Sequence, residues 1–241
     1  MTAALLTITL RALISRRRTL LLALVGALLV LATVLYRLSS PSEAEALVVM
    51  HGLLGDFGLG VLLPLVAVIV ATAAVGSELD DGTIVYLLAK PIPRWRIVLV
   101  KLIVAWLLVV LLVMPAIVVA ALIGYPDASL AAGYGAAATF GALEYTAVFL
   151  ALSLVTSRAL IIGLAYVVVW EGVVAGLFAG TRVLSIRQHA LAVADALGGD
   201  AAAAADLAVG AAVAVGLAVS VLATALAIRR LERVELRGET A

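Results

Sequence analysis

Hydrophobic residues run along the chain in six long stretches, and polar or charged residues gather between them. The stretches are residues 19–38, 58–75, 97–123, 130–155, 160–179 and 207–228. An α-helix needs roughly 20 apolar residues to cross a bilayer, whereas the average helix of a soluble protein has about 12 residues. The pattern therefore predicts an all-α membrane protein with six transmembrane helices.

Composition narrows the class of function as well as the fold. Hydrophobic residues make up 66% of the 241 residues and charged residues 13%, against roughly 45–50% and about 25% in soluble domains. The chain has no cysteine, and its two histidines, His51 and His189, lie far apart and outside the predicted spans. These facts exclude a soluble globular domain, disulfides and thiolate chemistry. We expect no catalytic residues and no metal site.

The basic residues predict the orientation of the spans, because lysine and arginine are enriched in the cytoplasmic connections of membrane proteins. Of the 16 lysines and arginines, only Arg37, Arg182 and Arg187 fall on the side opposite the termini. Both termini, including a tail of residues 229–241, are thus predicted to be cytoplasmic. Arginine outnumbers lysine 14 to 2 and alanine is abundant, which is typical of a GC-rich bacterial genome. We therefore expect a bacterial plasma-membrane protein.

Residues 1–18 show an amphipathic helical pattern before the first span. Apolar and polar positions recur at spacings of three and four, and the basic residues suit anionic headgroups. The apolar positions are Ala3, Leu6, Leu10 and Leu13, and the opposite face holds Thr7, Arg11, Ser15 and Arg18. We predict a surface helix on the inner membrane face. The alternative is a basic topology signal with no further role.

Three connections lie on the predicted outer side. Residues 39–57 are predicted to form a polar loop, and residues 124–129 a short turn built on Tyr125-Pro126-Asp127. Residues 180–206 are longer and rich in alanine, with a helical pattern on either side of Gly198-Gly199. This third segment is too polar to span the membrane, but we expect it to dip into the outer leaflet.

The most informative stretch is residues 76–96, between the second and third spans on the predicted cytoplasmic side. Ser77 followed by Asp80 resembles a helix start, and Lys90-Pro91 ends the helix because a residue before proline avoids the α region. An apolar patch lies between these signals, formed by Ile84, Leu87 and Leu88. The pattern predicts a short surface helix.

The third span is predicted to begin at the end of this stretch. Pro93 suits the first turn of a helix. Three basic residues follow it, which we expect to hold the span at the level of the lipid headgroups: Arg94, Arg96 and Lys101.

This stretch resembles the coupling region in membrane subunits of ATP-binding-cassette transporters of the second membrane family. The residues that carry the resemblance are Glu78, Gly82, Thr83, Leu87, Leu88, Pro91, Arg94 and Lys101. Weaker support comes from Trp170-Glu171-Gly172 and from residues 182–187. The family also has six spans, cytoplasmic termini, an amphipathic elbow helix before the first span and apolar extracellular helices after the fifth. All of these match the pattern above.

The resemblance implies a mechanism divided between chains. Such transporters combine two membrane subunits, identical or paralogous, with two ATPase subunits that bind ATP and Mg. The helix between spans two and three docks on the ATPase as a coupling helix, and the eight residues named above would make or support that contact. The alternative is that they only cap a helix and anchor it at the interface. The chain has no phosphate-binding loop, so it cannot hydrolyse ATP alone.

The family is dominated by exporters, so the resemblance implies export of a hydrophobic or amphiphilic solute, and no nucleic-acid partner. A secondary transporter or channel working without an ATPase is the alternative. Such carriers commonly show an inverted repeat, and we find none in the sequence.

Two carboxylates, Glu144 and Glu171, fall within predicted spans. A charged side chain at mid-bilayer costs on the order of 2.5–3.5 kcal/mol, so each should face the protein interior or a watery cavity. No lysine or arginine lies deep in a span, so we expect hydroxyl and ring donors as partners: Tyr145, Thr146, Ser153, Tyr166 and Trp170. One hypothesis places Glu144, Glu171 and Trp170 on a translocation pathway or gate. The other is a hydrogen bond that fixes helix packing.

Overall fold

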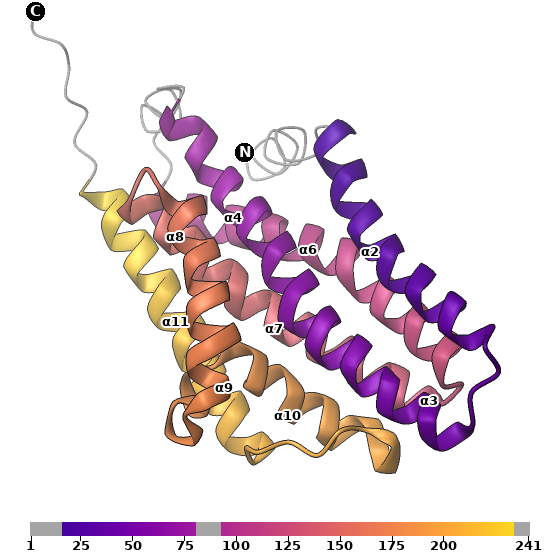
Figure 1. Ribbon diagram of the computed structural model, residues 1–241. Helices are drawn as coiled ribbons and strands as arrows, with labels where there is room; N and C mark the ends of the chain where they lie inside the picture. The colour runs from indigo at the N-terminus through magenta and orange to yellow at the C-terminus, as the bar shows by residue number, and fades with distance from the viewer. Residues whose placement is uncertain (1–15, 81–92, 234–241) are drawn as a thin grey trace, which may run out of the picture.

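The computed structural model describes residues 16–80 and 93–233, and every regular element in these ranges is helical. Six helices are long and apolar enough to cross a membrane, which confirms the predicted fold class. Figure 1 shows them as a bundle. The spans are α2 (Arg16–Arg37), α3–η1–α4 (Glu43–Met50, His51–Leu62, Leu63–Asp80), α6 (Arg94–Gly124), α7 (Ala128–Val155), α8–η2–α9 (Ala159–Ala165, Tyr166–Val174, Ala175–Leu177) and α11 (Val209–Glu232).

The fourth span, α7, forms the centre of the bundle. Buried residues make up 61% of its most apolar window and 67% of that of the second span, against 22% for α2, 17% for the fifth span and 22% for α11. Helix α7 packs against α4, α6, α10 and α11. Glycine allows the close approach of α10, because a Cβ on Gly133 would lie 2.6 Å from the backbone of Gly198. The less buried spans expose leucine and valine side chains outward, as expected for helices that face lipid.

The second span is longer than predicted, and the polar loop predicted at 39–57 is wrong. Helix begins at Glu43, where Ser42 and Glu45 form a reciprocal capping box. It then continues without a break through the π-helical segment η1 into α4. Apolar side chains among the polar residues explain the difference, since Met50 and Leu54 are fully buried. The predicted position of His51 outside the spans is also wrong, because His51 lies within this span.

The turn predicted at 124–129 is confirmed. Helix α6 ends at Gly124, and Asp127 caps α7 by accepting hydrogen bonds from the backbone N–H groups of Ser129 at 2.7 Å and Leu130 at 3.0 Å. The Ser129 hydroxyl also donates to this carboxyl. Its hydrogen bond contributes most, and the backbone hydrogen bonds add to it, in lowering the pKa of Asp127.

Between the fifth and sixth spans lie η3 (Ala179–Leu184), α10 (Ile186–Gly198) and η4 (Gly199–Ala201). The helix expected before Gly198-Gly199 is present as α10. After it comes only the single turn η4, and the chain is then irregular up to Ala208. Gly199 has a φ of 64°, which glycine adopts without a steric penalty. Helix α10 packs against α7 and α11 and lies at one end of the bundle. The predicted entry of residues 180–206 into the outer leaflet stays a prediction.

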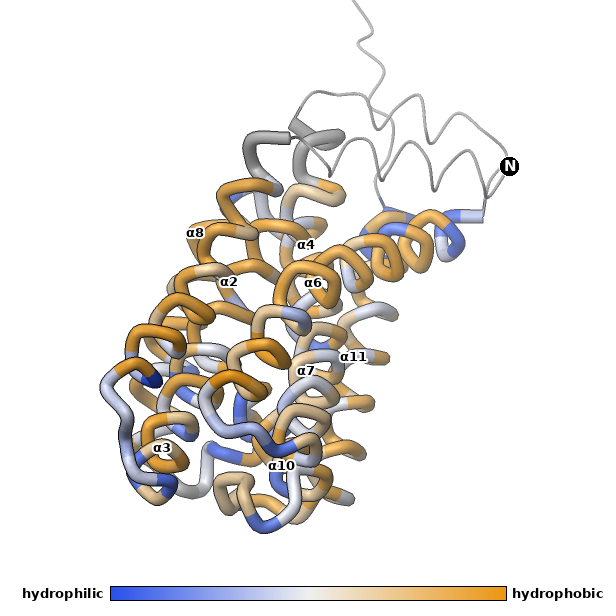
Figure 2. The backbone as a smooth tube through the Cα atoms, turned by 90° about the vertical axis from the view of Figure 1, so that its right-hand side faces the viewer, coloured by the Kyte–Doolittle hydropathy of each residue, from blue (hydrophilic) through white to orange (hydrophobic). Residues whose placement is uncertain are grey.

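The two ends of the bundle differ in charge. The start of α2, the end of α4, the start of α6 and the end of α11 lie together at one end, and α3 and α10 lie at the other (Figure 1). We call the first the basic end, because the described part of it holds Arg94, Arg96, Arg158, Arg229, Arg230 and Arg233. We call the second the α10 end. Figure 2 shows hydrophobic tubes along the spans and hydrophilic residues gathered toward the ends.

Three predicted features fall wholly or mostly outside the described residues. They are the amphipathic elbow helix of 1–18, the coupling helix within 76–96 and the far part of the 229–241 tail.

Candidate functional site

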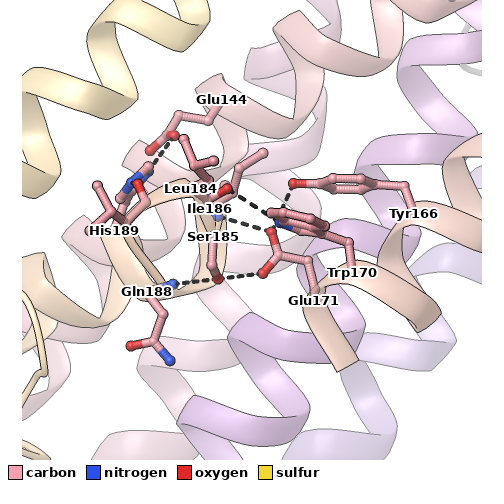
Figure 3. A network of polar contacts seen from close by, with 10 residues as sticks. Glu144, Tyr166, Trp170, Glu171, Leu184, Ser185, Ile186, Gln188 and His189 are labelled. Atoms are coloured by element: carbon pink, nitrogen blue, oxygen red, sulfur yellow. Dashed lines mark hydrogen bonds and ion pairs between the residues drawn. The ribbon is translucent and has the colours of Figure 1, made fainter. Parts of the chain in front are cut away.

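Buried polar contacts converge on residues 183–189, which connect η3 to the first turn of α10. Glu144 of α7 approaches from one side and Glu171 of η2 from another, as Figure 3 shows. The site thus joins the fourth and fifth spans to the segment that closes the α10 end.

Glu171 binds the start of α10. Its Oε1 accepts hydrogen bonds from the backbone N–H of Ile186 at 2.9 Å and from the Tyr166 hydroxyl at 3.0 Å. Its Oε2 accepts one from the Ser185 hydroxyl at 2.5 Å. Ser185 is the N-cap of α10, and its Oγ also accepts from the backbone N–H of Gln188 at 3.2 Å. One buried carboxylate therefore holds three donors, two of them at a helix N-terminus.

A helix N-terminus is a favourable place for this carboxylate. The first N–H groups of a helix have no intrahelical acceptor, and the helix dipole adds positive potential there. An oxygen of Glu171 accepts from one of these groups, the N–H of Ile186. Its contacts explain how a carboxylate that is only 3% exposed is accommodated among apolar spans.

Glu144 and His189 form the second contact, and both are fully buried. Glu144 Oε2 lies 2.8 Å from His189 Nδ1, and His189 Nε2 lies 2.8 Å from the carbonyl oxygen of Val183. A carbonyl only accepts, so Nε2 carries a proton. The contact between Nδ1 and Oε2 then requires a second proton, carried by one of the two groups. The pair is therefore a charged imidazolium–carboxylate or its neutral tautomer, and both hold the same number of protons.

The electrostatics of His189 agree with this geometry. Burial by itself lowers the pKa of His189, but the hydrogen bond and the charge of Glu144 outweigh burial, so the pKa is raised. The raised pKa thus acts in the same direction as the hydrogen bonds, which require the second proton.

The expected partners of the two carboxylates were right only in part. Tyr166 does bind Glu171, but the Trp170 indole donates to the Leu184 carbonyl at 3.4 Å. The hydroxyls of Tyr145 and Thr146 have no hydrogen-bond partner among the described residues. Ser153 donates to the Leu150 carbonyl of its own helix. The partner of Glu144 is instead His189, which was not among the expected donors.

The third contact joins α10 to the second span. Arg187 pairs with Asp56, and its Nε donates to the Gly55 carbonyl at 3.3 Å. Further along, His51 Nε2 lies 2.9 Å from the Ala201 carbonyl. Asp56 and His51 both belong to η1, as Glu171 belongs to η2. The two π-helical segments thus supply much of the polar surface that holds α10, in keeping with the frequent placement of π-turns at functional sites.

Helix α11 packs against the Glu144 carboxylate at Gly216. A Cβ on Gly216 would lie 2.7 Å from Glu144 Cδ, far inside van der Waals contact. The second oxygen of Glu144, Oε1, is buried and has no hydrogen-bond partner among the described residues. The α11 backbone therefore packs directly against one half of the carboxylate while His189 holds the other half.

At the basic end, two of the predicted basic residues join neighbouring spans. Lys101 is only 4% exposed and donates through Nζ to the Ala74 carbonyl of α4 at 2.6 Å. Arg94 donates through Nη1 to the carbonyls of Leu231 at 2.6 Å and Glu232 at 3.3 Å. The level of both residues relative to the lipid headgroups stays a prediction.

The other residues that carry the resemblance cannot be placed in the same way. Helix α4 contains Glu78 in its backbone, but its side chain lies outside the described part of the structure. Gly82, Thr83, Leu87, Leu88 and Pro91 lie outside the described residues altogether. Among the described residues, no group of three or more histidines and carboxylates is placed to hold a metal ion.

Comparison with known proteins gives one match. A family model described as ABC-2 family transporter protein matches residues 14–188. No curated protein matches the chain. The matched range contains the first five spans and both glutamates of the site.

Proposed function

Because the chain belongs to the ABC-2 family of transporter proteins, we propose that it is a permease subunit driven by a separate ATP-binding-cassette ATPase. Family membership carries the permease role and implies both an ATPase partner and a membrane subunit. The proposal adds two ATPase copies, which bind ATP and Mg, and a second membrane subunit that is identical or paralogous. The observation that carries it is the family match, which runs through the first five spans and the segment between the second and third.

The coupling segment of 76–96 is the proposed contact with the ATPase. Support comes from its flanks, since α4 ends and α6 begins at the basic end, beside the start of α2 and the end of α11 (Figure 1). Excess basic charge favours the cytoplasm, where ATP is found. We assign Glu78, Gly82, Thr83, Leu87, Leu88 and Pro91 to the contact itself. Arg94 and Lys101 join the segment's flanks to neighbouring spans.

The transported solute is proposed to be hydrophobic or amphiphilic and to be exported across a bacterial plasma membrane, with both termini cytoplasmic. For Glu144, Glu171 and Trp170 we propose a gating role. Each forms a contact with residues 184–189 at the α10 end, so opening that end would require these contacts to change. The alternative function, a secondary transporter, requires neither an ATPase nor a coupling segment.

The test is mild extraction of the tagged protein from its native host, followed by identification of the proteins that copurify. We expect an ABC-type ATPase in near-equal amount. Glu78→Lys, and separately Leu87→Ala with Leu88→Ala, should each lower its recovery by about tenfold or more, because such contacts contribute a few kcal/mol.

Matched variants separate loss of the contact from a general loss of folding. Glu232→Lys reverses a charge on an exposed residue of the same end, and Leu20→Ala with Leu21→Ala shortens an exposed leucine pair of α2. Both should retain the ATPase. Recovery of the unaltered chain alone, stable and without an ATPase, would favour the secondary transporter.

A further inference from the structure

We propose that α11 carries movement of the coupling segment to the α10 end, with Arg94 as the positioning residue at the basic end and Gly216 as the contact at the other. This inference rests on the proposed function. It arises because the two ends of one helix touch the two regions of the molecule that a transport cycle must connect.

The first link is Arg94, the first residue of α6 and two residues beyond the undescribed part of the coupling segment. Its guanidinium donates to the carbonyls of Leu231 and Glu232. These are the last two residues of α11, where carbonyl groups lack intrahelical donors and the helix dipole is negative. A cation is therefore well matched to this place, and it ties the exit of the coupling segment to the end of the sixth span.

The second link is the helix itself. Helix α11 runs unbroken over 24 residues and contains no proline, the residue most often responsible for a sharp kink. At 1.5 Å per residue, the 15 residues from Gly216 to Leu231 span about 22 Å. Only 22% of its most apolar window is buried. It is thus a continuous helix that packs on one side against α7, α10 and α6 and is exposed on the other, so a displacement at one end is carried along its length.

The third link is the contact of Gly216 with Glu144. The α11 backbone lies so close that no Cβ fits between them. Glu144 in turn binds His189, and His189 binds the carbonyl of Val183. A shift or rotation of α11 must therefore displace either the Glu144 carboxylate or its contact with α10, because packed interiors have no free volume to absorb the movement.

The experiment uses the lack of cysteine in the chain, which leaves a single introduced thiol as the only label site on this subunit. Gln188→Cys places a reporter in the first turn of α10, where residue 188 is half-buried. The complex with its ATPase is placed in lipid nanodiscs, and the rate of labelling by a charged maleimide is measured with and without ATP and vanadate. We expect nucleotide to change this rate in the parent complex.

Arg94→Gln should reduce that nucleotide response about fivefold or more, the size of a typical coupling between sites, while the ATPase still copurifies and hydrolyses ATP. Arg94→Lys should retain much of the response, because it keeps a cation near the α11 carbonyls. Arg96→Gln is the matched control: it removes one positive charge two residues away, from a side chain that stacks on Trp95, and should change nothing.

Gly216→Ala tests the other end of α11 and decides the question if Arg94→Gln does not fold. Its control is Gly210→Ala in the same helix, where an added Cβ has no neighbour within 4 Å. We expect Gly216→Ala to weaken the nucleotide response about fivefold and Gly210→Ala to leave it intact. Adding Arg94→Gln to Gly216→Ala should weaken the response little further, since both interrupt one linkage.

Two results would overturn the inference. One is a parent complex in which nucleotide leaves the labelling rate at residue 188 unchanged. The other is a full nucleotide response in both Arg94→Gln and Gly216→Ala. Absence of any ATPase bound to the parent protein is a different failure, because it would overturn the proposed function and the inference with it.

Discussion

The two ends of the bundle are held by opposite kinds of polar contact. At the α10 end, the carboxylate of Glu171 accepts hydrogen bonds from side-chain hydroxyls and from the first N–H of a helix, and Glu144 shares a proton contact with His189. At the basic end, the cations of Arg94 and Lys101 donate to backbone carbonyls, in part at the last turn of a helix. Each end thus places charge where the helix dipole favours it.

The difference lies in what remains when a contact is lost. The N–H of Ile186 begins α10 and has no intrahelical acceptor, so without Glu171 it would be buried and unpaired. The carbonyl of Ala74 lies inside α4, where the helix supplies its own donor. Loss of Glu171 therefore leaves a buried backbone group unpaired, whereas loss of the Lys101 hydrogen bond does not.

Glu171→Ala should have the largest effect on stability. It leaves the Ser185 hydroxyl, the Ile186 N–H and the Tyr166 hydroxyl without their acceptor, at a cost of about 3 kcal/mol or more. We expect a clearly lower melting temperature in detergent, followed by tryptophan fluorescence. Glu171→Gln keeps an acceptor oxygen, so its melting temperature should lie between those of Glu171→Ala and the unaltered protein. An unchanged melting temperature in Glu171→Ala would show that these contacts do not hold the α10 end.

A smaller, pH-dependent effect is expected from His189. Its pKa is raised in the folded protein, so the stability it contributes is fully present below the unfolded value of about 6.5 and is lost as pH rises through the folded pKa. The charged groups nearest to it are Glu144 and Glu171. The melting temperature should fall as pH rises above about 6.5 and through the folded pKa, and His189→Gln should flatten this dependence. An equal slope in both proteins would assign the pH dependence to other groups.

Lys101→Met should have the smallest effect. It removes the buried ammonium and its hydrogen bond to the Ala74 carbonyl, but keeps most of the packed volume. We expect a loss of about 1 kcal/mol, well below that of Glu171→Ala in the same melting assay. A larger loss than that of Glu171→Ala would reverse the contrast between the two ends.

Much of the fold could be predicted from sequence, because membrane thickness sets the length of an apolar helix regardless of its neighbours. The six spans, the turn at Asp127 and the helix before Gly198 all follow local rules. The prediction of a loop at 39–57 was wrong because polar residues such as Glu43 and Glu45 lower the hydropathy of the segment, and they concealed the apolar Met50 and Leu54 that pack in the core. The capping pattern of Ser42 and Glu45 was the local signal that could have placed the helix start.

The candidate site was predictable only in its carboxylates. Glu144 and Glu171 stand out in sequence because an ionisable group in an apolar span needs a reason to be there. Their partners did not stand out. His189 is 45 residues from Glu144, and Ser185 and Ile186 read as parts of an ordinary connection.

The class of protein, the number of spans and the residues whose burial requires compensation follow from the local pattern, because these depend on hydrophobicity summed over neighbouring positions. The groups that provide that compensation are specified by tertiary contacts. Helix α10 folds back onto α7, η1 and η2, and Arg94 reaches the end of α11. Such pairings join residues distant in the chain, and nothing in the local pattern specifies them.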